Sequence, residues 1–98
     1  MTGRMVGAAE ALAFGLVHEV APVGGHLGAA ARLADTIAAN APLAVGLAKR
    51  LVDLGAHADT RTFLELELWA QSQLKGTDDA REGASAALGR RPPKFSGR

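Results

Sequence analysis

The end of the chain holds the only side chains whose types and spacing suggest recognition of a ligand. Lys94 and Arg98 flank Phe95 within the last five residues. Cations next to an aromatic ring suit a nucleotide, which presents both phosphates and a flat ring. The same residues also fit a plain solvated basic tail. Binding through Lys94, Phe95 and Arg98 is therefore a hypothesis at this point.

The rest of the sequence shows no catalytic or metal-binding pattern. The three histidines, His18, His26 and His57, share no ligand spacing, and the chain has no cysteine. Glu65 and Glu67 would point about 200° apart on a helix, so they cannot form an acid/base pair. We expect the acidic side chains to lie on solvated helix faces. We predict no catalytic residue and no metal site.

Composition narrows the class of protein further. The 98 residues make at most one small domain, and the formal net charge of +1 creates no field that would attract nucleic acid or an anionic membrane. No apolar run approaches the roughly 18 residues that span a bilayer, and the N-terminal stretch makes an unconvincing signal peptide. We expect a cytoplasmic protein with no nucleic-acid partner and no membrane partner.

Leucine and alanine far outnumber β-branched residues, which favours helix over sheet. We predict an all-α fold of about five helices, with at most one or two very short strands near the N-terminus. The predicted elements of this single helical domain, 1–98, are a short helix and a strand-like stretch within 1–24, helices at 27–39, 42–54, 59–74 and 77–91, and an extended tail at 92–98.

Capping residues mark where these helices begin and end. Asp59 and Thr77 are suited to N-cap positions, where a side-chain oxygen accepts a main-chain N–H. Gly15 and Asn40 are suited to helix C-termini. Pro42 fits the first turn of a helix, where its missing N–H costs nothing.

The last helix is expected to run from about residue 78 to residue 90. Asp78 and Asp79 would lie at its positive end, and Arg90 and Arg91 at its negative end, where they complement the helix dipole. Pro92 and the proline after it forbid continuation. The tail would therefore leave the helix in an extended conformation.

The segment 59–74 combines a strand-like alternation with the length of a helix, and its sixteen residues without a breaker favour helix. Such a helix is apolar over more than half of its circumference, so it needs partners on two sides. One of those partners can be another subunit. Its apolar residues are Phe63, Leu64, Leu66, Leu68, Trp69, Ala70 and Leu74.

Three segments carry a resemblance to a known family: "TGRMVGAAEALAFGLVHEV" at 2–20, "IAANAPLAVGLAKRLV" at 37–52, and "TDDAREGASAALGRRPPKFSGR" at 77–98. Their order and spacing resemble the C-terminal portion of the crotonase superfamily, the enoyl-CoA hydratase/isomerase family. The resemblance covers essentially the whole chain. It implies the helical oligomerisation domain of the crotonase fold without its ββα spiral core.

The resemblance also implies that catalysis and assembly belong to different parts of the family's fold. In the family, the spiral core holds the oxyanion-hole N–H groups and the catalytic acids, and no residue of this chain matches them. The C-terminal helices pack trimers together and complete the acyl-CoA pocket. On this likeness Phe95, with Lys94 and Arg98, would lie by the adenine and phosphates of CoA, while Phe63 and Trp69 would face the acyl chain or the trimer seam. No cofactor is implied beyond the CoA thioester substrate.

Two other functions stay open from the sequence. One is a non-catalytic module that self-associates as a homo-oligomer or binds a full-length relative. The other is a stand-alone binder of CoA or acyl-CoA.

Overall fold

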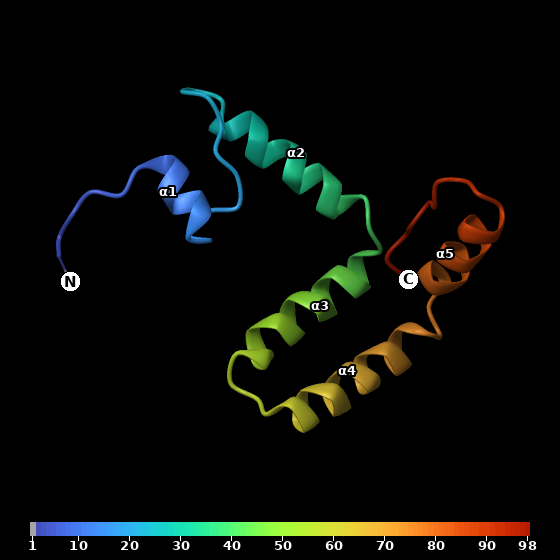
Figure 1. Ribbon diagram of the computed structural model, residues 1–98. Coiled ribbons are helices and arrows are strands. Elements are labelled where there is room, and N and C mark those ends of the chain that lie inside the picture. Colours follow the sequence, from blue (N-terminus) through green and yellow to red (C-terminus); the bar gives the residue numbers. More distant parts are fainter. Residues whose placement is uncertain (1) are drawn as a thin grey trace. The chain divides into compact units, whose positions relative to one another are not determined.

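The computed structural model describes residues 2–98, and within that range it contains helices and no strand (Figure 1). The helices are α1 (Ala8–Ala13), α2 (His26–Ala38), α3 (Pro42–Gly55), α4 (Thr60–Leu74) and α5 (Asp78–Leu88). The predicted all-α fold of about five helices is confirmed. The strand-like stretch at 16–20 is irregular. A strand needs the hydrogen bonds of a neighbouring strand, and no segment of the described range supplies them.

The chain divides into two compact units, with the division inside α2, between Asp35 and Thr36. None of the helices in residues 2–98 combines the length and the apolar content needed to cross a membrane.

In the first unit, α1 ends where the sequence predicted, at a left-handed glycine. Gly15 has a φ of 71°. Its N–H donates to the carbonyl oxygen of Leu12 at 3.0 Å, and the N–H of Leu16 donates to that of Ala11 at 2.9 Å. These two bonds form a Schellman motif, which satisfies the last free carbonyls of the helix. Glycine adopts this conformation without the steric cost of a Cβ.

In the second unit, α3 and α4 pack side by side as an antiparallel helix pair (Figure 1). Pro42 begins α3, as predicted, and Gly55 ends it. Asp59 caps α4: its carboxylate accepts the Thr62 N–H at 3.0 Å. A Cβ atom built on Gly55 would lie 2.8 Å from Cε2 of Phe63, so the Phe63 ring fills the space beside this glycine at the turn between the helices.

The helix α5 is shorter than predicted because the chain turns left-handed at Arg90, whose φ is 48°. The N–H of Arg91 donates to the carbonyl oxygen of Ala86 at 3.0 Å, and that of Arg90 donates to Ala87 at 3.2 Å. This is a second Schellman motif, with arginine where glycine is usual. It reverses the chain after Leu88 and directs the following residues back toward α5.

Very little apolar side chain is buried within the described residues. The buried apolar residues are three alanines, Ala29, Ala70 and Ala86. On α4, by contrast, Leu68 is 67% exposed and Trp69 is 56% exposed. Most of the large apolar side chains of this chain are therefore exposed or only partly buried.

Substituting Gly55 by alanine should destabilise the pairing of α3 with α4. The new Cβ would overlap the Phe63 ring, and overpacking of this kind costs about 1–3 kcal/mol. This cost exceeds the gain of at most about 1 kcal/mol that alanine brings to a helix. We expect the urea midpoint for loss of helical circular dichroism to fall.

Gly46→Ala is the matched control, because nothing lies within 4 Å of a Cβ at Gly46 in the same helix. It should raise the midpoint. A rise of similar size for Gly55→Ala would show that Phe63 does not pack against this glycine.

Candidate functional site

The predicted binding residues lie on a tail, residues 92–98, that folds back along α5 (Figure 1). The tail has no regular secondary structure, as expected, but it is not a free end. Two carboxylates of α5 hold it through main-chain and side-chain hydrogen bonds. This return of the tail places Lys94, Phe95 and Arg98 at one end of the second unit.

The first of these carboxylates is Glu82. Its two oxygens accept from the Arg91 guanidinium, Oε1 from Nη1 at 2.6 Å and Oε2 from Nη2 at 2.8 Å. Oε1 also accepts the Lys94 main-chain N–H at 2.7 Å. This two-pronged pairing is the strongest geometry for a carboxylate with arginine. Glu82 therefore holds the chain at both the turn and the beginning of the tail.

The second carboxylate is Asp79, which is only 3% exposed. Its Oδ1 accepts the Ser96 N–H at 2.6 Å and the Ser96 hydroxyl at 3.3 Å, and its Oδ2 accepts the Gly97 N–H at 2.8 Å. A buried carboxylate needs such donors, since an unpaired one is costly. The main-chain N–H of Asp79 in turn donates to the carbonyl oxygen of Arg98 at 3.1 Å.

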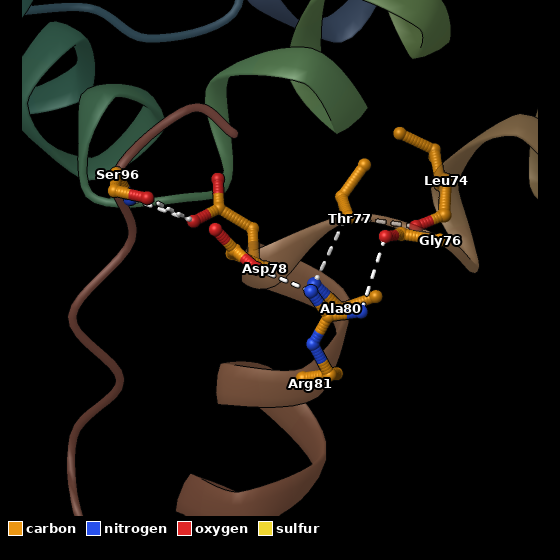
Figure 2. Close-up of polar contacts among 8 residues, drawn as sticks. Leu74, Gly76, Thr77, Asp78, Ala80, Arg81 and Ser96 are labelled. Atoms are coloured by element: carbon orange, nitrogen blue, oxygen red, sulfur yellow. Dashed lines mark hydrogen bonds and ion pairs between the residues drawn. The ribbon is translucent and has the colours of Figure 1, made fainter.

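Figure 2 shows the beginning of α5, where Ser96 of the tail approaches the helix. The Thr77 hydroxyl oxygen accepts the Ala80 N–H at 3.1 Å and donates to the Leu74 carbonyl oxygen at 2.8 Å. The predicted N-cap is thus confirmed, and it also ties α5 to the end of α4. Arg81 adds an ion pair with Asp78 on the exposed side.

Phe95 is half-buried and lines an apolar pocket of about 300 Å³. Its ring lies on α5 at Gly83, where a Cβ would be 3.7 Å from Cε1 of the ring. The Lys94 and Arg98 residues are exposed. The other residues lining the pocket come from the beginning of α3, the end of α4 and α5: Ala41, Leu43, Ala44, Leu74, Thr77, Asp79, Ala80, Gly83 and Ala84.

The site combines an aromatic ring at an apolar pocket with two exposed cations. These groups are suited to binding a ligand. Its two acids are already engaged with hydrogen-bond donors of the chain. Within residues 2–98, no three histidine, cysteine or acidic side chains come together as a metal site. The arrangement can recognise a ligand that has both an apolar or aromatic part and negative charge.

The roles of the two acids differ from those predicted from the sequence. Asp79 was expected on a solvated helix face, and that expectation is wrong because the tail covers it. Arg91 was assigned to the helix dipole, but its guanidinium pairs with Glu82. The residues Glu82 and Arg91 are nine positions apart, and only the left-handed turn at Arg90 brings them together. No local pattern in the sequence indicates that turn.

Comparison with known proteins assigns the family. The sequence model of the enoyl-CoA hydratase/isomerase family matches residues 1–98. The chain belongs to this family, as the resemblance implied.

Relatives and solved structures agree with the assignment. The chain is 38% identical over 95 residues to a putative enoyl-CoA hydratase from Thermus thermophilus, and 34% identical over 98 residues to the 2,3-dehydroadipyl-CoA hydratase of Escherichia coli. These alignments cover 97% and 100% of this chain and 38% of each relative. An enoyl-CoA hydratase structure from Bacillus anthracis matches with a TM-score of 0.91 at 38% identity, over 99% of this chain and 38% of that one. The chain thus spans well under half the length of these relatives.

The contact between Glu82 and the tail should depend on pH in the acid range. Hydrogen bonds from the Arg91 side chain and the Lys94 amide lower the pKa of Glu82 from 4.5 to about 2. A lowered pKa means that the ionised form is favoured in the folded state. The stabilisation is therefore fully present above pH 4.5 and is lost as the pH falls toward about 2.

The measurement is a comparison with Glu82→Gln. The difference in urea midpoint between the two chains should be constant from neutral pH down to about pH 4.5 and then shrink toward pH 2. A difference that does not change across this range would contradict the pairing of Glu82 with Arg91 and the tail.

Proposed function

We propose that this chain forms the C-terminal helical portion of an enoyl-CoA hydratase/isomerase, where it contributes oligomer contacts and part of the acyl-CoA pocket and is not catalytic on its own. The observation that carries the proposal is the ordered tail, which places Phe95 at an apolar pocket and leaves Lys94 and Arg98 exposed. Membership of the family supplies the chemical context.

The ligand that best fits the tail is CoA. CoA presents an aromatic adenine and several phosphates, which match an aromatic ring and two cations. The name of the Escherichia coli relative says that it acts on a CoA thioester. Phe95 would pack against the adenine, while Lys94 and Arg98 would pair with phosphates. The CoA thioester would be the substrate of the complete enzyme, and no other cofactor is proposed.

We expect no catalysis by this chain alone, because of the groups that the reaction needs. Hydration of an enoyl thioester requires N–H donors placed for the developing oxyanion and acids placed to move protons. The buried acid of this chain, Asp79, holds the tail through three hydrogen bonds. Glu82 is paired with Arg91. Neither group is available to a substrate in this arrangement.

Oligomer contacts are proposed for the exposed apolar side of α4. Leu64 and Leu68 are one helical turn apart on one side of the helix, and Trp69 follows. All three are at least half exposed. Aromatic and leucine side chains of this size are typical of the core of subunit interfaces. The partner would be a further copy of the chain, in a trimer-like assembly, or a full-length relative.

CoA binding can be measured by titration calorimetry on the purified chain. We expect saturable heat, and we expect Phe95→Ala to weaken binding about fivefold or more, which corresponds to roughly 1 kcal/mol for one lost ring contact. Phe14→Ala is the control, because Phe14 is an exposed phenylalanine of the first unit. The same preparation should not hydrate a 2-enoyl-CoA.

Absence of heat for the wild-type chain would end the proposal of CoA recognition by the tail. Hydratase activity that stays with the purified chain would contradict the proposal that it is non-catalytic.

Assembly can be measured by light scattering. We expect the wild-type chain to have a mass above that of a monomer, and the double variant Leu64→Ser with Leu68→Ser to shift toward the monomer, because it removes apolar contact area. Leu88→Ser is the control: Leu88 is 90% exposed but lies on α5. A monodisperse monomer for the wild-type chain would contradict the assembly proposed for α4.

A further inference from the structure

We infer that Asp79 and Glu82 are positioning residues for CoA: they hold the main chain on both sides of Phe95 and so keep its ring at the pocket. The inference rests on the proposed contact between Phe95 and CoA. It assigns a role to two acids that do not themselves face the ligand.

The hydrogen bonds bracket Phe95. The residue before it, Lys94, donates its main-chain N–H to Glu82 at 2.7 Å. The residue after it, Ser96, donates its main-chain N–H to Asp79 at 2.6 Å. Because the Pro93–Lys94 and Phe95–Ser96 peptide groups are both held, the backbone around Phe95 has little freedom to move. The ring is thus directed onto α5 at Gly83.

The two acids are spaced somewhat more closely along α5 than the two donors are along the tail, and the acid side chains span the difference. Residues three apart on a helix share a face and are separated by about 4.5 Å along its axis. Two residues of extended chain span about 6.6 Å. Asp79 bonds the later tail residue, Ser96, and Glu82 the earlier one, Lys94, so the tail runs antiparallel to α5. One face of a single helical turn can therefore hold three consecutive tail residues.

The neighbouring acid, Asp78, lacks this role. It is exposed and pairs with Arg81 of the same helix. Asp79, in contrast, is 3% exposed. Within the described residues, the hydrogen bonds that its carboxylate accepts come from the tail residues Ser96 and Gly97. A negative charge near the beginning of α5 is therefore not sufficient for binding the tail. The position of the acid along the helix decides which acids bind it, so Asp78, one residue from Asp79, is a matched control.

The test combines two readouts on Asp79→Asn, Glu82→Gln and Asp78→Asn. The first is amide hydrogen exchange of residues 94–97 without CoA, followed by NMR. We expect Glu82→Gln to accelerate exchange at Lys94, and Asp79→Asn to accelerate it at Ser96 and Gly97, by tenfold or more. The second readout is CoA affinity by calorimetry, which should fall fivefold or more in both variants although Phe95 is intact. Asp78→Asn should change neither readout.

A charge exchange separates positioning from general stability. Glu82→Arg combined with Arg91→Glu can restore an ion pair, but residue 82 then offers no acceptor to the Lys94 N–H. We expect this double variant to keep its helical circular dichroism and still bind CoA weakly. Recovery of wild-type affinity would overturn the inference, because the pair would then matter only for folding.

The outcomes separate the inference from the proposed function. If the wild-type chain binds no CoA, the proposed function fails. If it binds CoA and both Asp79→Asn and Glu82→Gln bind equally well, the proposed function stands and the inference is wrong. If Asp79→Asn loses its helical structure, the CoA affinity of Glu82→Gln decides whether the inference holds. Glu82 is partly exposed and is not among the buried residues, so its substitution should leave the helix folded.

Discussion

The structure depends on one constraint: this chain can bury almost none of its large apolar side chains within itself. Three alanines are its only buried apolar residues in the described range, whereas Leu64, Leu68 and Trp69 of α4 are at least half exposed. Burial of apolar area is the main favourable term in folding, and alanine contributes little of it. The helices are therefore defined by local signals, such as the Asp59 and Thr77 caps and the Gly15 turn, and by the contact of α3 with α4.

Polar contacts hold the tail in place, whereas apolar packing holds such segments in a larger domain. Asp79 is buried because the tail covers it, and the tail is held because Asp79 and Glu82 accept its N–H groups. Such bonds are directional, so they define a position more narrowly than apolar contact does. They also use main-chain donors. The placement of Phe95 thus depends on the positions of the two acids along α5. The affinity of a ligand that contacts the ring would therefore depend indirectly on those acids.

The helices could be predicted from the sequence, and the return of the tail could not. Helix position follows from composition, periodicity and end signals that act within a few residues, which is why Pro42, Asp59 and Thr77 were assigned correctly. The contacts of Glu82 with Arg91 and of Asp79 with Ser96 span nine and seventeen residues. They need a left-handed turn at Arg90, a conformation that arginine seldom adopts and that no capping pattern indicates. Phe95, Lys94 and Arg98 were singled out by residue type alone, without the acids that place them.

Packing within this chain is too slight to make it a cooperative folding unit. Urea unfolding of the wild-type chain, followed by helical circular dichroism at a concentration where light scattering shows a monomer, tests this most directly. The slope of free energy against urea reports the surface exposed on unfolding, and small cooperative domains give about 1–3 kcal/mol/M. We expect a broad loss of helix with a slope below about 1 kcal/mol/M. A single steep transition of the monomer, with a slope in the range of ordinary domains, would contradict it.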